Sequence, residues 1–317
     1  MFLIIVISLL LIYTNCLKVP VNLLGISRNL SGYQTIKDSK SSYIYFMLKD
    51  PEVNICYSLK SLSMPEEIIN LDAIAVGRST FNVSIAPTEV TFNQVHSILY
   101  GDSSSALIYR FGRKYFNRTF DRSYPHTSLT KDTFTSIIKR IDQNLKLQFI
   151  VEVGSFTGNS ASIMGNVLKK EYPGSFLLCI DTWLGDLNMW VNKVVWKHLA
   201  VTEDGRPTVY YQFLANIIEQ NLTETVLPVS MSSIIGARFL RTYQFRPQLI
   251  YLDSAHEQGE TLIELALYWN ILQAGGVLFG DDWGWLSVRC DVKKFMYMRN
   301  ITTEHFGNTW LMKKTLN

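Results

Sequence analysis

The chain has 317 residues, of which 47% are apolar and 18% charged. This composition suffices for one large domain or two modest ones, and it excludes a disordered or fibrous protein. Lysine and arginine exceed aspartate and glutamate by only three, 30 against 27, with no basic block, so we expect no specific nucleic-acid partner.

An apolar run from Phe2 to Tyr13 opens the chain and is followed by the small or polar residues Thr14, Asn15 and Cys16. The run is shorter than the roughly 20 residues that span a bilayer. We interpret residues 1–16 as a secretory signal peptide that is cleaved near Cys16. No basic residue precedes the run, so retention as a membrane anchor is the alternative, and a membrane is a partner only in that case.

Five Asn-X-Ser/Thr sequons fit the same route, because glycosylation of such sites needs an oxidising lumen and an exposed asparagine. They begin at Asn29, Asn82, Asn117, Asn221 and Asn300. The sequence therefore predicts a glycoprotein of the secretory pathway, either retained in the lumen of the endoplasmic reticulum or secreted.

Residues 17–130 mix short apolar runs with Ser, Asn and Pro, without long helical periodicity or an internal repeat. We treat this stretch as an N-terminal region of unknown fold. A compact β-rich piece around Ile74 to Tyr109 is the one structure that its composition suggests.

A regular pattern begins at residue 131 and continues to the C-terminus. Apolar residues at helical spacing follow Thr130 and Asp132, which are possible caps. Short apolar strands then alternate with helices: we expect strands at residues 147–153, 176–180, 226–229, 248–252 and 276–280, and helices at residues 160–170, 208–220, 232–241 and 260–272. Five such strands separated by helices predict a parallel sheet covered on both faces.

The C-terminal residues carry a different signal. The segments ITTEHF and TWLMKK flank Gly307 and Asn308, a spacing and composition suited to a tight β-hairpin. Residues 131–317 are thus predicted to form a doubly wound α/β domain, a sheet of parallel strands with a C-terminal antiparallel hairpin.

A glycine-containing turn joins the first predicted strand to the next helix. In VEVGSFTGNSA the residues Glu152, Gly154, Gly158 and Ser160 lie where the strand passes into the helix. Glycine permits close approach of the backbone, and a helix N-terminus offers free N–H donors to a carboxylate-bearing ligand. The spacing is not the G-x-G-x-x-G of a pyrophosphate-binding turn, which disfavours a dinucleotide.

Two polar positions follow the next two strands. Asp181 ends the second strand, where a carboxylate can accept hydrogen bonds from both ribose hydroxyls of an adenosine moiety. Ser232 follows the third strand, where an adenine ring would lie, although a serine there also caps helices. Cys179, inside the apolar run FLLCI, is interpreted as a buried small residue and not as a nucleophile.

Three aspartates lie at neighbouring strand ends: Asp253 after one strand, and Asp281 and Asp282 after the next. A bound divalent cation is the usual reason to tolerate three carboxylates at one edge, and oxygen ligands suit Mg²⁺. His256, three residues after Asp253, could take a proton from a substrate hydroxyl. Five tryptophans in the loops after strand ends could wall an acceptor pocket: Trp183, Trp190, Trp196, Trp283 and Trp285.

Together these motifs resemble the Rossmann-like class I S-adenosylmethionine-dependent methyltransferases, in particular the metal-dependent O-methyltransferases of the catechol and macrolide-sugar type. The resemblance covers about residues 132 to 317. It implies that Glu152, Gly154, Gly158 and Ser160 hold the methionine part of the cofactor, Asp181 its ribose and Ser232 its adenine, with Asp253 also at the cofactor. It further implies that Asp253, Asp281 and Asp282 bind Mg²⁺, with His256 and Asp253 catalytic. His256 stands where the catechol enzymes have a lysine, and the Asp-Asp pair resembles the sugar-modifying branch.

The expected activity is methylation of a hydroxyl on a small molecule or glycan. A nicotinamide-dependent oxidoreductase is the nearest enzyme alternative, disfavoured by the glycine spacing and the hairpin. A catalytically inactive secreted module is the other, because the methyl donor is made in the cytosol while this chain carries a secretory signal.

Overall fold

The computed structural model describes residues 16–20, 33–37, 43–48, 89–101, 104–110, 127–191, 205–254 and 256–316. The chain divides into two compact units, Met1–Ser63 and Met64–Asn317. The predicted signal peptide, except for Cys16, lies outside the described residues, as do the sequons at Asn29, Asn82 and Asn117. Within the described ranges, no helix is both long and apolar enough to cross a membrane.

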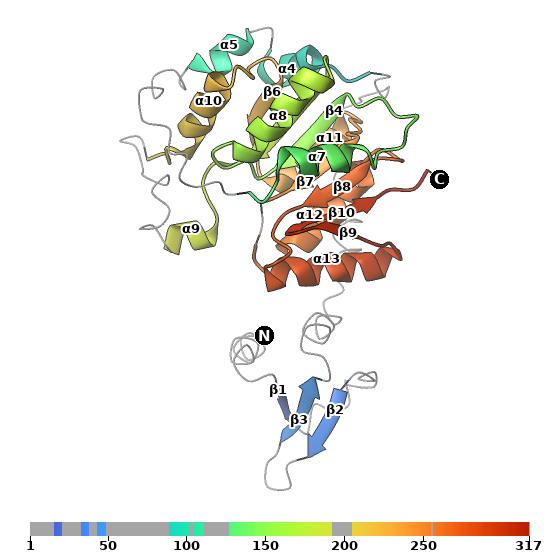
Figure 1. Ribbon diagram of the computed structural model, residues 1–317. Coiled ribbons are helices and arrows are strands. Elements are labelled where there is room, and N and C mark those ends of the chain that lie inside the picture. The colour runs from blue at the N-terminus through green and yellow to red at the C-terminus, as the bar shows by residue number, and fades with distance from the viewer. Residues whose placement is uncertain are drawn as a thin grey trace. The chain divides into compact units, whose positions relative to one another are not determined.

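The first unit contains a small antiparallel sheet, in which β3 (Tyr43–Leu48) lies between β1 (Cys16–Pro20) and β2 (Tyr33–Lys37) (Figure 1). This sheet falls in the region to which the sequence assigned no fold.

The second unit is built on a seven-stranded sheet with the order β6-β5-β4-β7-β8-β10-β9. Its strands are β4 (Phe149–Val153), β5 (Phe176–Asp181), β6 (Val226–Ser230), β7 (Leu249–Leu252), β8 (Val277–Gly280), β9 (Glu304–Phe306) and β10 (Thr309–Lys313). The strands from β6 to β8 are parallel, and β10 pairs antiparallel with both β8 and β9. The predicted doubly wound sheet and its C-terminal hairpin around Gly307 and Asn308 are therefore confirmed.

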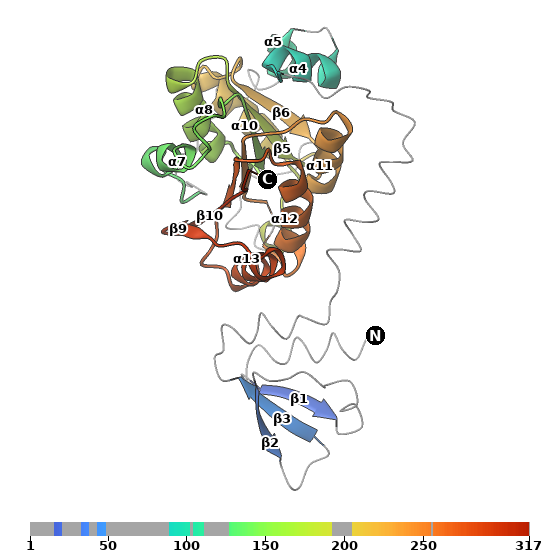
Figure 2. The same ribbon diagram turned by 90° about the vertical axis from the view of Figure 1, so that its right-hand side faces the viewer.

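Helices cover both faces of this sheet (Figure 2). One face carries α7 (Lys131–Ile138), α8 (Asn159–Glu171) and α10 (Val209–Glu219), and the other carries α11 (Ser233–Thr242), α12 (Glu260–Ile271) and α13 (Leu286–Arg299). Along β4, Phe149, Val151 and Val153 enter one buried cluster while Ile150 enters the other. Strand side chains alternate between faces, so a strand buried on both sides reads as a continuous apolar run.

The described part of the segment from Ile74 to Tyr109 is helical, so the expected β-rich piece is wrong there. Thr91 caps α4 (Phe92–Tyr100), and α5 (Ser105–Ile108) follows. The hydroxyls of Tyr100 and Tyr109 donate to the carbonyl oxygens of Pro228 and Val226 on the edge strand β6. Among the described strands, none pairs with β6 on this side, and the two hydroxyls satisfy these carbonyls. This explains why residues before the predicted boundary at 131 pack on the sheet.

Candidate functional site

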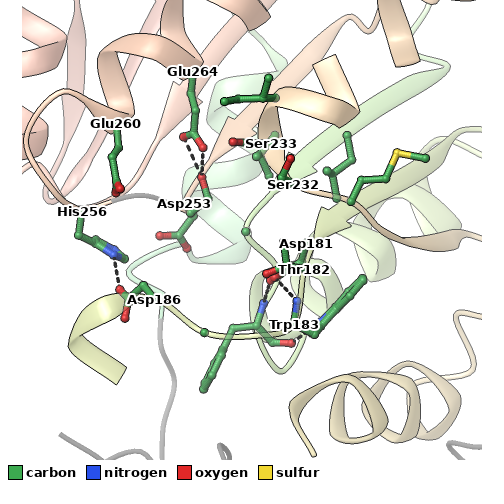
Figure 3. A pocket seen from close by; sticks show the side chains of 18 of the residues that line it. Asp181, Thr182, Trp183, Asp186, Ser232, Ser233, Asp253, His256, Glu260 and Glu264 are labelled. Carbon is green, nitrogen blue, oxygen red and sulfur yellow. Dashed lines mark hydrogen bonds and ion pairs between the residues drawn. The ribbon is translucent and has the colours of Figure 1, made fainter. Parts of the chain in front are cut away.

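The candidate site lies at the carboxyl ends of β4 and β7, where the strand order changes direction. Two pockets open there, of about 430 Å³ and about 380 Å³. The first extends over the ends of β5 and β6 (Figure 3), and we call it the adenosine-side pocket because it is lined by Asp181 and Ser232, for which the sequence predicts contacts with an adenosine moiety. The second extends toward β8 and α8, and we call it the acceptor-side pocket because it is lined by Trp285, which the sequence predicts beside an acceptor. Six residues line both: Gly154, Phe156, Asp186, Met189, Asp253 and His256.

Gly154 allows the two central strands to meet at this junction. Its φ is 83°, and a Cβ atom there would lie 2.2 Å from the carbonyl oxygen of Asp253. At Gly158, the N-cap of α8, φ is 86° and a Cβ would lie 2.9 Å from the ring of Phe213. Both predicted glycines are thus required for close approach, and Gly154 itself lines both pockets.

Glu152 lies beneath the turn and lines neither pocket. Its side chain is fully buried and accepts hydrogen bonds from the hydroxyls of Ser155 and Ser160, at 2.7 Å and 2.5 Å, and from the thiol of Cys179 at 3.1 Å. Burial raises the pKa of Glu152 to about 7 despite these donors. Glu152 therefore fixes the turn and the position of Ser160, which does line the acceptor-side pocket. Cys179 is buried, as predicted.

Asp181 and Ser232 are brought together on the adenosine-side pocket. The Oδ2 atom of Asp181 accepts the backbone N–H groups of Ser155 and Phe156, both at 2.8 Å. Its Oδ1 atom accepts the backbone N–H of Trp183 at 2.7 Å (Figure 3). Burial raises the pKa of Asp181, and these N–H donors oppose that rise. The backbone N–H of Thr182 is a further donor to this carboxylate, and Asp181 lines the adenosine-side pocket. Ser232 caps α11 by accepting the N–H of Ile235 at 3.3 Å.

Asp253, His256 and Asp282 each offer one potential metal-ligand atom, and these atoms lie within 4.8 Å of one another. The Nε2 atom of His256 is 2.7 Å from Asp282 Oδ2, and its Nδ1 atom is 3.0 Å from Asp186 Oδ2. Burial lowers the pKa of His256, but its bonds to Asp186 and Asp282 raise it to about 10. With both ring nitrogens paired to carboxylates, the ring is charged at neutral pH and would have to release one of its own protons before it could accept one from a substrate. Two carboxylates and an imidazole are suitable ligands for a divalent cation.

Asp281, the third predicted metal ligand, is outside this cluster. Its carboxylate is 4% exposed and accepts the backbone N–H groups of Ser128 and Asp282, at 2.7 Å and 2.9 Å, the Ser128 hydroxyl, and the side-chain amide of Asn308 at 3.2 Å. Asp281 thus joins the segment before α7 to the C-terminal hairpin. Asp282 has a positive φ of 61°, and its carboxylate reaches His256 instead.

Two functional candidates escaped the sequence prediction. Asp186 follows a Trp-containing loop with no motif around it, and only its contact with His256 identifies it. Glu264 on α12 is 4% exposed, accepts from the Ser254 hydroxyl at 2.7 Å and 2.8 Å, and lines the adenosine-side pocket (Figure 3). The sequence signal that could have identified Glu264 is an acidic residue placed among the apolar residues of a predicted helix.

The predicted tryptophan walls are present only in part. Trp183 lines the adenosine-side pocket and Trp285 the acceptor-side pocket, whereas Trp190 and Trp283 line neither. Trp196 lies outside the described residues.

A comparison with known proteins points to the part of the chain that contains this site. Residues 151–283 match the family model of a methyltransferase domain. No curated protein matches the chain significantly.

Solved structures with some likeness include three methyltransferases. CalS11, a calicheamicin methyltransferase, is 14% identical to this chain with a TM-score of 0.39. The alignment covers 78% of this chain and 91% of the CalS11 chain. An O-methyltransferase from Bacillus cereus in complex with SAH is 11% identical with a TM-score of 0.38. The alignment covers 82% of this chain and 97% of that chain. A precorrin-6y C5,15-methyltransferase from Geobacter metallireducens is 9% identical with a TM-score of 0.39. The alignment covers 61% of this chain and 93% of that chain.

At these identities and TM-scores the likenesses do not define an acceptor. The domain match and the sheet order are the stronger findings, and the residues matched include Gly154, Asp181, Asp253 and Asp282. The chain therefore carries a methyltransferase domain over residues 151–283 and resembles the class I S-adenosylmethionine-dependent methyltransferases in the fold built around it.

Proposed function

We propose that this protein transfers the methyl group of S-adenosylmethionine to a hydroxyl oxygen of a small molecule or glycan, with the help of a divalent cation. The observation that carries the proposal is the junction of the two pockets at Gly154, Asp253 and His256. A methyl donor that spans the two pockets and an acceptor in the second would meet at this junction.

The polar groups of the two pockets suit the two ends of an elongated cofactor. Asp181 and Ser232 would contact the adenosine part in the first pocket. Ser160 and the free N–H groups at the start of α8 would bind the methionine carboxylate in the second. The middle of such a molecule would then pass Gly154, which lines both pockets.

The cofactor supplies a reactive methyl group on a sulfonium, so positioning of the acceptor is the main task of the protein. Asp253 and Asp282 would hold the cation, and a bound divalent cation lowers the pKa of a nearby hydroxyl. The hydroxyl and amide side chains of Ser128, Asn188 and Asn308 line the same pocket and could orient a polar acceptor. No covalent enzyme intermediate is needed.

The first test is calorimetry with S-adenosylhomocysteine and with NADH, followed by methyl transfer from labelled S-adenosylmethionine to a panel of hydroxylated acceptors. We expect that S-adenosylhomocysteine binds, that NADH does not bind, and that the labelled methyl group appears in one of the acceptors. Binding without turnover on any acceptor would favour the inactive secreted module. Binding of NADH alone would favour the oxidoreductase.

A further inference from the structure

We propose that Glu264, on α12, selects adenine in the adenosine-side pocket by accepting a hydrogen bond from the 6-amino group of the base. The inference deepens the proposed function, from which it takes the presence of an adenosine moiety. Its test separates the choice of base from the binding of the donor as a whole.

Glu264 is a buried carboxylate in the wall of this pocket. It lines the adenosine-side pocket but not the acceptor-side pocket, and it is 4% exposed. Figure 3 shows its carboxylate pointing from α12 toward the other labelled side chains of the pocket. Acidic residues are rarely buried unless they are paired. Among the residues that the structure describes, no lysine, arginine or histidine forms an ion pair with Glu264.

The hydrogen-bond donors around Glu264 leave part of its acceptor capacity open. The Ser254 hydroxyl lies 2.7 Å from one carboxylate oxygen and 2.8 Å from the other. A hydroxyl has a single hydrogen, so it donates to only one of these oxygens at a time. The Ser233 hydroxyl is a further donor. A carboxylate has about four acceptor positions, so the two hydroxyl hydrogens leave room for an N–H group of a ligand.

Glu264 lies on the side of the pocket where the sequence predicts the adenine ring. Ser232, the residue predicted beside the ring, directly precedes Ser233. The Ser233 hydroxyl donates to Glu264, and the Ser233 carbonyl oxygen accepts the Tyr268 hydroxyl at 2.8 Å. Tyr268 follows Glu264 by one helical turn, so the two side chains lie on the same face of α12. This face of α12 is therefore fixed against the first residues of α11.

Apolar neighbours of these residues line the pocket as well. Met231 follows β6, Ile234 lies in the first turn of α11, and Ile263 directly precedes Glu264 on α12. Ligand pockets commonly combine apolar walls with a few polar groups that fix the orientation of the ligand. The apolar side chains would contact the faces of a purine ring, and Glu264 would contact its edge.

The choice of base follows from the chemistry of a carboxylate, which in its charged form only accepts hydrogen bonds. The 6-amino group of adenine donates hydrogen bonds, whereas hypoxanthine has a carbonyl oxygen at the same position. Two acceptors that face each other repel. Burial raises the pKa of Glu264 to about 7, and an amino group that donates to the charged form opposes this rise.

The test measures binding of S-adenosylhomocysteine and S-inosylhomocysteine to the full-length protein by calorimetry at about pH 8, where the Glu264 carboxylate is mostly charged. The two compounds differ only in the base. We expect the parent to bind the adenosyl compound about 100-fold more tightly than the inosyl compound. Glu264→Gln should reduce this preference to about threefold or less, because an amide N–H can donate to the carbonyl oxygen of hypoxanthine.

Two control variants separate recognition of the base from the packing and charge of the pocket. Tyr268→Phe removes the hydrogen bond to the Ser233 carbonyl oxygen and should weaken both compounds equally, so that the preference is kept. Glu260→Gln neutralises an exposed acid that lies one turn earlier on α12 and also lines the pocket. Its preference should stay within about threefold of that of the parent. Circular dichroism shows whether each variant is folded, and Glu264→Asp, which withdraws the carboxylate by one methylene, replaces Glu264→Gln if the latter does not fold.

The inference is overturned if the parent binds the two compounds equally well, or if folded Glu264→Gln keeps the preference of the parent. It is also overturned if Tyr268→Phe or Glu260→Gln loses the preference as fully as Glu264→Gln, since packing or net charge would then explain it. A parent that binds neither compound would contradict the proposed function as well. A parent that binds both without preference would contradict this inference alone.

Discussion

The α-carbon of Gly154 faces the carbonyl oxygen of Asp253 so closely that a Cβ atom would lie 2.2 Å from that oxygen. The two residues end adjacent parallel strands, β4 and β7, and both line the two pockets. The contact that joins the central strands is therefore also the place where donor and acceptor would meet.

Gly154→Ala should destabilise the protein by about 3 kcal/mol or more and abolish binding of S-adenosylhomocysteine, because a backbone atom cannot move aside. Gly174→Ala is the control, since Gly174 has a similar φ of 88° but no atom within 4 Å of the place where a Cβ would lie. We expect it to cost about 1 to 2 kcal/mol and to leave binding intact. Denaturant unfolding and calorimetry measure both, and equal losses in the two variants would contradict the steric explanation.

Asp181→Asn should weaken binding of S-adenosylhomocysteine about 10- to 100-fold, because it removes a charged acceptor that holds the turn and faces the adenosine-side pocket. Asp132→Asn, on the exposed first turn of α7, is the control and should bind like the parent. Unchanged calorimetric affinity in Asp181→Asn would place the ribose elsewhere.

The raised pKa of Glu152 predicts that the stability of the protein depends on pH. Burial raises its pKa from 4.5 to about 7, so the folded chain holds this proton more tightly than the unfolded chain. Its contribution to stability is complete below about pH 4.5 and is lost as the pH rises through about 7. The difference between the pKa values of Glu152 in the unfolded and folded chains corresponds to roughly 3 kcal/mol of the free energy of unfolding.

The measurement compares the free energy of unfolding of the parent and Glu152→Gln between about pH 5 and about pH 8. The variant should become relatively more stable toward high pH. Glu171→Gln, at an exposed position on α8, should follow the parent at every pH. A parent-to-variant difference that does not change with pH would show that Glu152 is ionised in the fold throughout.

Asp281 and Asp282 are adjacent but should respond differently to alanine substitution. Asp281→Ala should cost about 3 to 4 kcal/mol of stability, because it removes a buried carboxylate that accepts from the N–H of Ser128 and the amide of Asn308 and leaves these donors without their acceptor. Asp282→Ala should cost less than about 1 kcal/mol and lose metal binding. Thermal unfolding and calorimetry distinguish them, and the reverse ranking would refute the assignment of Asp281 as a structural acceptor.

The secretory prediction is open to a direct test on two described sequons. Asn221 and Asn300 are exposed, have positive φ values of 54° and 52°, and line neither pocket. Expression of the full chain in eukaryotic cells should give glycans at both positions and a mature N-terminus near residue 17, detected by mass mapping. Asparagines without glycans and an intact Met1 would argue against entry into the secretory route.

The order of strands and helices from residue 131 onward was predictable because it depends on local periodicity. The run FIVEV has apolar residues on both sides of the strand, with Glu152 as the exception, because helices cover both faces of the sheet. The two residues Gly307 and Asn308 suit a tight turn. The helix α13 was not predicted, although Val288, Val292 and Phe295 lie at the i, i+4 and i+7 spacing of one helix face.

The sequence by itself determined the fold of the domain and the edge at which its polar residues gather, since parallel strands bring their carboxyl ends together. Only the tertiary structure decided which side chains meet there. Asp281 and Asp282 turn to opposite partners because the backbone at Asp282 has a positive φ. Asp186 reaches His256 from a loop distant in sequence. Side-chain direction at strand ends depends on backbone dihedrals and on contacts across the fold, and spacing along the chain encodes neither.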